Sequence, residues 1–161
     1  HDVSCLIKDV NNDGLPDVFV ISAYNGGVRK SKLQLYLNQG NYNFVDATAT
    51  KILGYDETMH SSYQPVFVDA NGDGVDDIWV KHFDWKSNSV SNALLVNNNG
   101  VYTQSNKTIT DNLSIDFGKN FGSTHLGPSL PIKINNTWYL IVTYYRDPAV
   151  YIDIKKLNWL F

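Results

Sequence analysis

Two acidic segments of nine residues, 60 positions apart, constrain this chain more than any other feature of its sequence. The first, at residues 9–17, reads Asp-Val-Asn-Asn-Asp-Gly-Leu-Pro-Asp, and the second, at residues 69–77, reads Asp-Ala-Asn-Gly-Asp-Gly-Val-Asp-Asp. Both place side-chain oxygens at positions 1, 3, 5 and 9, and glycine at position 6, where a sharp turn favours a residue without a Cβ. The three carboxylates at these positions repel one another unless a cation neutralises them.

Calcium is the cation that suits this pattern. It accepts about six to eight oxygen ligands in a flexible loop, whereas Mg²⁺ requires a tighter octahedron. We therefore predict two Ca²⁺ ions, each held by the side chains at positions 1, 3, 5 and 9 and by the carbonyl of position 7. The predicted ligands are Asp9, Asn11, Asp13, Leu15 and Asp17 in the first loop and Asp69, Asn71, Asp73, Val75 and Asp77 in the second.

Two other interpretations of the loops are an ordinary turn and an EF-hand. An ordinary Asp/Asn/Gly turn without metal explains a single copy well, but it explains poorly two copies at matching points of a repeat. An EF-hand requires a glutamate at position 12 and a helix on each side. Position 12 is Val20 in the first loop and Val80 in the second, and the flanking residues alternate as in strands.

The rest of the chain predicts an all-β fold. Helical periodicity is nearly absent, while short runs of β-branched and aromatic residues are bounded by turn residues. These runs cover residues 17–22, 32–38, 65–69, 77–81, 138–145 and 150–154. The two loop-containing copies read as strand, acidic loop, strand, connection, strand, Asn/Gly turn and strand, which is a four-stranded antiparallel meander.

A third, degenerate copy begins near Gly127. In it Asn135 and Asn136 replace the whole acidic loop, and Asn-Asn suits a two-residue hairpin turn with positive φ at both positions. Residues 150–154 would form its third strand, and residues 156–161 its fourth strand or a closing segment. No metal site is predicted in this copy.

Several of these motifs together resemble a known family. The Asp-x-Asn-x-Asp-Gly-x-x-Asp loop and apolar strand, followed by Leu-Tyr-Leu-Asn-Gln-Gly and Asn-Phe-Val-Asp-Ala-Thr, are similar to the FG-GAP/VCBS repeat of integrin-α-type β-propellers. The resemblance covers about residues 1–110. It implies that each acidic loop joins the innermost strand of a blade to the second strand. It also implies that calcium has a structural role, on the face opposite the usual ligand-binding face.

The resemblance leads to a fold prediction: an all-β, partial β-propeller of about two and a half to three four-stranded antiparallel blades. The predicted repeats span about residues 1–58, 59–120 and 121–161. Propellers usually close with about four to eight blades, so the rest of its own propeller or further chains would complete the ring. We expect apolar faces at the two ends of the segment, drawing on Phe19, Tyr36, Trp79, Leu95 and Trp138.

Histidine and aromatic residues at the predicted strand ends and connections are candidates for ligand binding. His60 and His125 lie just before innermost strands, and the others lie in or near the connections from second to third strands, so all would share the face opposite the loops. The alternative is that these are unrelated surface residues. Phe19 and Trp79 occupy equivalent repeat positions, which favours packing between blades over sugar stacking. The candidates are Tyr24, His60, His82, Trp85, His125 and Tyr145.

Composition excludes several classes of function. The chain has 161 residues and a net charge of −3 with no basic stripe, which argues against nucleic-acid binding. No apolar run reaches the length of about 20 residues that a membrane span requires. Cys5 is the only cysteine, so no internal disulfide is possible. The chain opens without methionine or signal peptide, which suggests a piece of a longer protein.

No catalytic motif is present, since the sequence has no Gly-x-Ser-x-Gly elbow, no His-Glu-x-x-His and no phosphate-binding glycine loop. We therefore predict a protein that is not an enzyme: an extracellular, secreted or cell-surface module for adhesion to a protein or glycan, stabilised by calcium. One alternative is a piece of a propeller-type polysaccharide-degrading enzyme whose active site lies elsewhere. Another is a structural repeat in a toxin or other large secreted protein.

Overall fold

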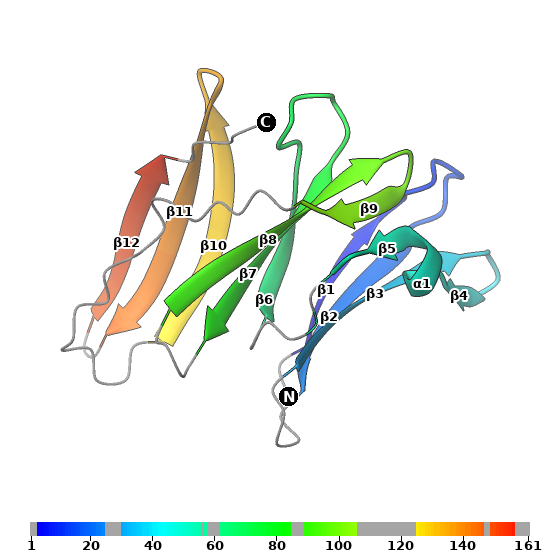
Figure 1. The fold of residues 1–161 in the computed structure, drawn as a ribbon, viewed down its shortest axis with the longest axis horizontal. Coiled ribbons are helices and arrows are strands. Elements are labelled where there is room, and N and C mark those ends of the chain that lie inside the picture. Colours follow the sequence, from blue (N-terminus) through cyan, green and yellow to red (C-terminus); the bar gives the residue numbers. More distant parts are fainter. Residues whose placement is uncertain are drawn as a thin grey trace.

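A computed structural model of the chain describes residues 3–24, 30–55, 57, 62–84, 89–105, 125–146 and 149–156. These residues form three β-sheets and one short helix (Figure 1). The all-β class predicted from the sequence is confirmed. Among the described residues, no helix has the length and apolar character needed to cross a membrane.

The first sheet is the predicted four-stranded meander. Its strands lie in sequence order and each is antiparallel to the next. Side chains alternate along the second strand: Phe19 and Ile21 are buried on one face, whereas Val18 and Val20 are only half-buried on the other. The strands are β1 (Val3–Lys8), β2 (Asp17–Tyr24), β3 (Lys30–Asn38) and β4 (Phe44–Asp46).

The second sheet repeats the meander and adds a fifth strand at its edge. This extra strand, β5, comes from the connection that follows the first sheet, and it pairs in parallel with β9. Ile52 of β5 is buried between the sheets. The strands are β5 (Ile52–Leu53), β6 (Ser62–Val68), β7 (Asp77–Asp84), β8 (Ser89–Asn98) and β9 (Val101–Gln104).

The same connection contains the helix α1 (Thr48–Lys51), which the sequence did not predict. It is a single turn, closed by hydrogen bonds from the Thr50 and Lys51 amides to the Ala47 carbonyl. The Asp46 carboxylate accepts a hydrogen bond of 2.9 Å from the Thr48 amide. A helix this short carries no periodic pattern, which explains why sequence periodicity missed it.

The third sheet has three described strands, β10 (His125–Ile134), β11 (Thr137–Arg146) and β12 (Ala149–Lys156). The turn between β10 and β11 consists of Asn135 and Asn136, with φ of 48° and 61°. This confirms the predicted two-residue hairpin turn in place of an acidic loop. The fourth strand or closing segment was predicted at residues 156–161; Lys156 ends β12, and residues 157–161 lie outside the described residues.

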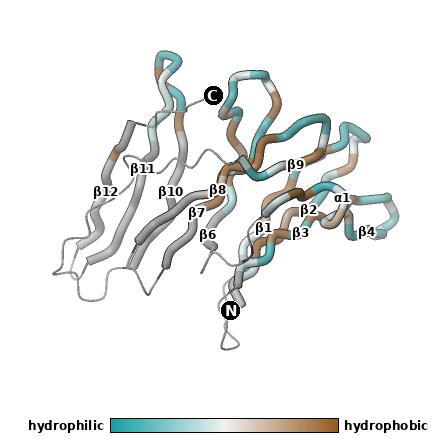
Figure 2. The backbone as a smooth tube through the Cα atoms, viewed as in Figure 1, coloured by the Kyte–Doolittle hydropathy of each residue, from teal (hydrophilic) through white to brown (hydrophobic). Residues whose placement is uncertain are grey.

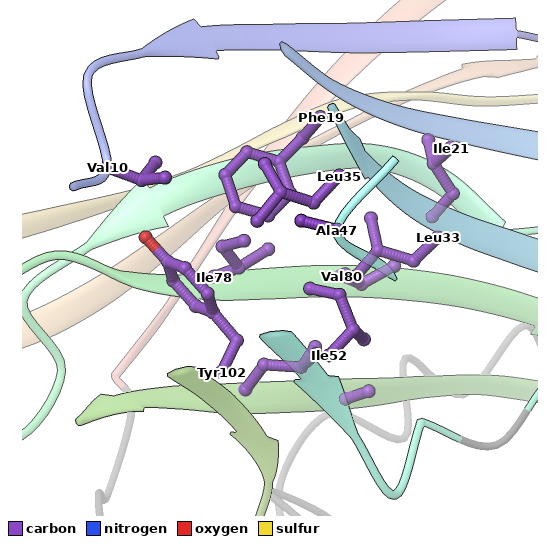
Figure 3. Close-up of a cluster of buried hydrophobic side chains, with 12 residues drawn as sticks. Val10, Phe19, Ile21, Leu33, Leu35, Ala47, Ile52, Ile78, Val80 and Tyr102 are labelled. Atoms are coloured by element: carbon purple, nitrogen blue, oxygen red, sulfur yellow. The ribbon is translucent and has the colours of Figure 1, made fainter. Parts of the chain in front are cut away.

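The sheets pack face to face, and the first two share a large apolar core (Figure 3). The ring of Phe19 meets the rings of Tyr102 and Phe67 edge to face, with centroids 5.1 and 5.7 Å apart. Figure 2 shows hydrophobic residues along the strands of these two sheets and hydrophilic residues in the loops. The buried members are Val10, Phe19, Ile21, Leu33, Leu35, Ala47, Ile52, Ile78, Val80, Ala93, Leu95 and Tyr102.

A smaller cluster joins the second sheet to the third. Along β7, Ile78 and Val80 face the first sheet, while Trp79 between them packs on the opposite side with Leu94. Trp138 of β11 lies against this second cluster. Both Phe19 and Trp79 are fully buried between sheets, so the prediction that they serve packing rather than sugar stacking is confirmed.

The predicted composition of the end faces is wrong for most of its residues. Phe19, Trp79 and Leu95 are completely buried at the internal junctions, and Trp138 points toward the second sheet. Only Tyr36, half-buried, remains of the predicted set on the outer side of the first sheet. The sequence did not reveal which alternate residues of each strand face inward.

Other apolar residues form the outer faces. Ile7 on the first sheet is 66% exposed, and on the third sheet Ile152 and Ile154 are 68% and 59% exposed. Ile154 pairs with Ile141, and Ile134 pairs with Thr137, which places these isoleucines on the side of the third sheet opposite Trp138. Apolar surface is therefore present at both ends, as expected, but from different residues.

The three sheets lie within residues 3–46, 52–104 and 125–156. Strand β5 belongs by position to the predicted first repeat, yet it hydrogen-bonds with the second sheet. The connection between the first two sheets is thus shared by both of them.

Candidate functional site

The two acidic loops occupy the same end of their sheets. The first joins β1 to β2 and the second joins β6 to β7, and both lie toward the top of the view in Figure 1. In each case the strand after the loop begins with the aspartate at position 9, Asp17 or Asp77. The structure therefore places the loops at matching points of two sheets that pack against each other.

The aspartate at position 1 folds each loop back on itself. Asp9 accepts hydrogen bonds from the amides of Gly14, at 2.8 Å, and Asp13, at 3.2 Å. In the second loop Asp69 accepts them from the amides of Gly74, at 3.1 Å, and of the residue at position 4, at 2.7 Å. Position 1 is thus bonded to position 6 in both loops.

Positions 3 and 5 form a second set of contacts. The Asn11 side-chain oxygen accepts from the Asp13 amide at 3.0 Å, and its Nδ2 donates to Asp13 Oδ2 at 2.8 Å. The other oxygen of Asp13 accepts from the Leu15 amide at 2.8 Å. The corresponding residues of the second loop make the same three bonds at 3.0, 2.9 and 2.8 Å.

Glycine is required at position 6 by the backbone conformation and not by a lack of room for a side chain. Gly14 and Gly74 both have φ of 84°, and a Cβ at either would meet no atom within 4 Å. Such a φ is strained for any residue with a side chain. The predicted sharp turn at position 6 is therefore confirmed in both loops.

The aspartate at position 9 is buried and ties the loop to the sheet. Asp17 is completely buried, and its two oxygens accept from the amides of Val10, at 2.9 Å, and Asn38, at 2.8 Å. Asp77 is equally buried and accepts from Ala70 at 3.1 Å and Asn97 at 2.8 Å. This role needs no metal, and it fixes the start of the loop relative to the end of the third strand.

Two asparagines extend this arrangement, and sequence reasoning did not include them in the site. Asn38 donates from Nδ2 to the Pro16 carbonyl at 3.1 Å and accepts from the Gly40 amide at 2.9 Å. Asn97 makes the same pair of bonds, at 3.1 and 2.9 Å, with the Asp76 carbonyl and the Gly100 amide. The signal was present, because both asparagines end a similar segment of their repeat, Leu-Tyr-Leu-Asn at residues 35–38 and Leu-Leu-Val-Asn at residues 94–97.

The electrostatics of the second loop are unfavourable without a cation. Burial raises the pKa of Asp77, and the nearby charge of Asp73 raises it further, although amide hydrogen bonds from Asn97 and Ala70 oppose the shift. Within the described part of the chain, the only ion pair joins Lys8 to Asp76, so no lysine or arginine neutralises a predicted ligand.

The donor chemistry of both loops fits calcium, since every predicted ligand atom is an oxygen. In the described residues, however, no three acidic, histidine or cysteine side chains converge closely enough to hold an ion as they stand. The oxygens of Asp9, Asn11 and Asp13 accept loop amides instead. Closing the loop on an ion therefore requires these side chains, of which Asn11 and Asp13 are exposed and Asp9 is half-buried, to exchange amide contacts for metal contacts.

The residues predicted to bind a ligand lie away from the loops where the structure describes them. Tyr24 ends β2, and His82 and Tyr145 lie near the ends of β7 and β11, so all three are at strand ends opposite the loops. His125 begins β10 and pairs directly with Tyr145. His60 and Trp85 lie outside the described residues, and nothing shows that the other residues meet in one site.

A comparison with protein families supports the motif analysis. Residues 9–80 match the model of the FG-GAP-like repeat. The match starts at the first residue of the first acidic loop and ends inside β7, so it contains both loops. The chain thus carries FG-GAP-like repeat sequence, as its motifs predicted. No curated protein and no solved structure matches the chain.

Proposed function

We propose that this chain is a segment of a calcium-stabilised β-propeller that serves as an extracellular or cell-surface binding module for a protein or glycan. The observation that carries the proposal is the repetition of one hydrogen-bond pattern in two acidic loops at equivalent points of two packed sheets. The FG-GAP-like repeat supports the propeller interpretation.

The way in which the sheets pack also supports blades. We define the front face of a sheet as the side carrying the third residue of its second strand, which is Phe19 or Trp79, and the back face as the opposite side. The front face of the first sheet packs on the back face of the second, which carries Ile78. The front face of the second sheet packs against Trp138 of the third. Successive sheets therefore stack in one sense, as blades around a ring do.

Front-to-back stacking of three sheets leaves one back face and one front face that are not covered by another of these sheets. The first sheet presents its back face, with Ile7 exposed, and the third presents the face carrying Ile152 and Ile154. Exposed apolar surface of this kind marks an interface. The proposed partners there are further blades, either from the rest of the same polypeptide or from other chains.

Sedimentation tests this part of the proposal. The 161-residue chain at micromolar concentration should associate through the outer faces, and Ile154→Asp should weaken the association. Tyr42→Asp is the control, because Tyr42 is fully exposed on a turn of the first sheet. A stable monomer with a sharp melt would contradict the open-ring interpretation.

Calcium has a structural role in this proposal. Each ion would be held by the oxygens at positions 1, 3, 5, 7 and 9 of its loop, and it would supply the positive charge that these carboxylates lack. Sites of this kind in extracellular modules have dissociation constants of about 0.1–1 mM, which matches a setting outside the cell.

Calorimetry tests the calcium sites directly. The chain should bind two ions, and Asp13→Ala and Asp73→Ala should each lose one. Asn136→Ala, in the exposed turn of the third hairpin, should keep both. An ion that binds only the folded chain raises the melting temperature, and the stabilisation grows with the logarithm of the free calcium concentration above the dissociation constant. No binding at millimolar calcium would contradict the proposal.

The ligand would bind at the end of the sheets opposite the loops, where Tyr24, His82, His125 and Tyr145 lie. The alternative remains a propeller-type polysaccharide-degrading enzyme or toxin scaffold with its active site outside this chain. A glycan and protein array with the whole protein, run beside a polysaccharide turnover assay, separates the two. Binding without turnover supports the adhesion module, and turnover supports the enzyme.

A further inference from the structure

An ion pair links the two acidic loops across the junction of the first two sheets. Lys8, the last residue of β1, forms it with Asp76 at position 8 of the second loop. The Lys8 ammonium also lies 5.1 Å from the centre of the Phe67 ring. Lys8 directly precedes Asp9, and Asp76 directly precedes Asp77, so each partner is covalently next to a predicted calcium ligand.

A second contact joins the loops through the turn between β8 and β9. A Cβ at Gly100 would lie 3.4 Å from the Val10 carbonyl oxygen, so the first loop rests against this turn. On one side, the Val10 amide donates to Asp17. On the other, the Gly100 amide donates to Asn97, whose own amide donates to Asp77. A continuous series of contacts therefore runs from one position-9 aspartate to the other.

Tyr102 of β9 is buried in the core that the first two sheets share. Burial raises the pKa of its hydroxyl, and the charges of Asp76, Asp77 and Asp17 raise it further. Figure 3 shows the hydroxyl of Tyr102 and the side chain of Val10 at the same end of the core cluster. Charges from both loops therefore act on one side chain at this junction.

We propose that the two loops are coupled calcium sites, in which an ion at one loop strengthens binding at the other through the Lys8–Asp76 ion pair and the contact of Val10 with Gly100. This inference rests on the proposed function, because it requires that both loops bind calcium. It adds that the sites fill together and that calcium joins the first two sheets.

The sign of the coupling follows from ordering. An ion in the first loop fixes the backbone at Asp9 and Val10. Asp9 is bonded to Lys8, and Val10 rests on Gly100. The second loop then binds its ion against a junction that is already ordered, and the entropic cost is lower. Repulsion between the two ions acts in the opposite direction, and raising the salt concentration screens it.

The link is specific to this junction. The repeat counterpart of Lys8 is Val68, and the counterpart of Asp76 in the first loop is Pro16. The third sheet has the Asn135 and Asn136 turn in place of a loop. The same ion pair therefore cannot form between the second and third sheets.

The test is a pair of calcium titrations on the full chain, followed by calorimetry. Asp13→Ala disables the first loop and reports the affinity of the second alone, and Asp73→Ala does the reverse. Both variants change exposed residues. Each remaining loop should bind calcium about fivefold more weakly than when its partner loop is filled, and the two factors should be equal because coupling is reciprocal.

The same titrations in a chain that also carries Lys8→Met and Asp76→Asn measure how much the Lys8–Asp76 ion pair contributes to the coupling. The coupling factor should fall toward one, while the general charge effect of Asp13→Ala is the same in both backgrounds. Lys133→Met is the control, because Lys133 lies over the Trp138 ring on the third sheet, and it should leave the factor unchanged.

The outcomes separate the two proposals. If both loops bind calcium with affinities independent of each other, the coupling is wrong and the proposed function stands. If coupling persists without Lys8 and Asp76 at full strength, the ion pair does not carry it and the inference as stated is overturned. If no calcium binds, the proposed function and this inference both fail.

Discussion

The junction between the first and second sheets differs from the junction between the second and third, although both join hairpins of the same repeat type. The first buries Phe19 and Tyr102 in edge-to-face contact and adds the ion pair of Lys8 with Asp76. Among the described residues, the second holds a smaller cluster around Trp79, whose buried Nε1 has no hydrogen-bond partner. An unsatisfied buried donor costs about 1–3 kcal/mol.

Each acidic loop contributes one residue to the junction on its own side, Val10 in the first and Ala70 in the second, but the third hairpin has no acidic loop and so offers no counterpart of Asp76. In the first junction, the acidic loop contributes Val10 to the core and contacts the neighbouring sheet through Gly100. In the third sheet, Asn135 and Asn136 make the turn and both are exposed. An acidic loop therefore does more than connect two strands, because it also forms part of the surface that holds adjacent sheets together.

The largest expected effect comes from removing the central ring of the first junction. Phe19→Ala should lower the free energy of unfolding by about 3–5 kcal/mol, because it leaves a cavity at a fully buried site. Chemical denaturation measures it. Tyr42→Ala, at a fully exposed position, should change stability by less than about 0.5 kcal/mol. Comparable losses for both would contradict the assignment of Phe19 to the core.

An effect of similar size is expected at the buried aspartate of the second loop. Asp77→Ala should destabilise the chain in the absence of calcium, by about 1–3 kcal/mol for each of the amides of Ala70 and Asn97 left without an acceptor. Asp73→Ala is the comparison, since Asp73 is exposed and should matter mainly when calcium is present. Denaturant melts with chelator and with calcium distinguish them. A loss at Asp77 that appears only with calcium would argue against its structural role.

Alanine substitutions at two glycines test how much the contact between Val10 and Gly100 matters for stability. Gly100 and Gly40 both have φ of 77°, so alanine is strained by about 1–2 kcal/mol at either position. Only at Gly100 would the Cβ touch a neighbouring sheet, 3.4 Å from the Val10 carbonyl oxygen, since at Gly40 the nearest atom is 3.9 Å away on Leu15. Gly100→Ala should therefore destabilise the chain more than Gly40→Ala in thermal melts. Equal shifts would mean that the Val10 contact is loose.

The smallest effect concerns pH and a residue outside both junctions. Hydrogen bonds from the Thr48 side chain and amide hold the pKa of Asp46 below its ordinary value of 3.8. The stability that ionised Asp46 contributes is therefore fully present above about pH 4 and is lost as the pH falls through the lowered pKa. Asp46→Asn does not titrate, so its melting temperature should approach that of the unmodified chain below pH 4. A constant difference from pH 6 to pH 3 would contradict this.

Most of the features that were predicted correctly depend on local sequence patterns. Period-2 alternation and turn residues were sufficient for the strands, for the order of the first meander and for the positive φ at Asn135 and Asn136. The loop motif located Gly14 and Gly74 at the turn. Each of these depends on neighbours within a few residues, and local chemistry decides them.

What the sequence did not predict depends on contacts between distant segments. Alternation says that Phe19 and Val18 face opposite ways, but not which of them meets another sheet, and so the end faces were assigned to the wrong residues. The bonds from Asn97 and the ion pair of Lys8 join residues that only the packing of two sheets brings together. Helix α1 and strand β5 are too short to have a pattern of their own.

Strand β5 has a consequence for how the chain matures during synthesis. Ile52 and Leu53 pair with Tyr102 and Thr103 of β9, the last strand of the second sheet in sequence order, which a ribosome makes only after β6, β7 and β8. Until β9 has been made, Ile52 and Leu53 have no strand to pair with, and the side chain of Ile52 remains exposed to solvent. Pairing of this kind, between segments far apart in sequence, forms slowly and leaves intermediates exposed. The first repeat therefore cannot finish folding before the second is complete, so we expect a nascent chain that is truncated before β9 to be a target for chaperones and proteases.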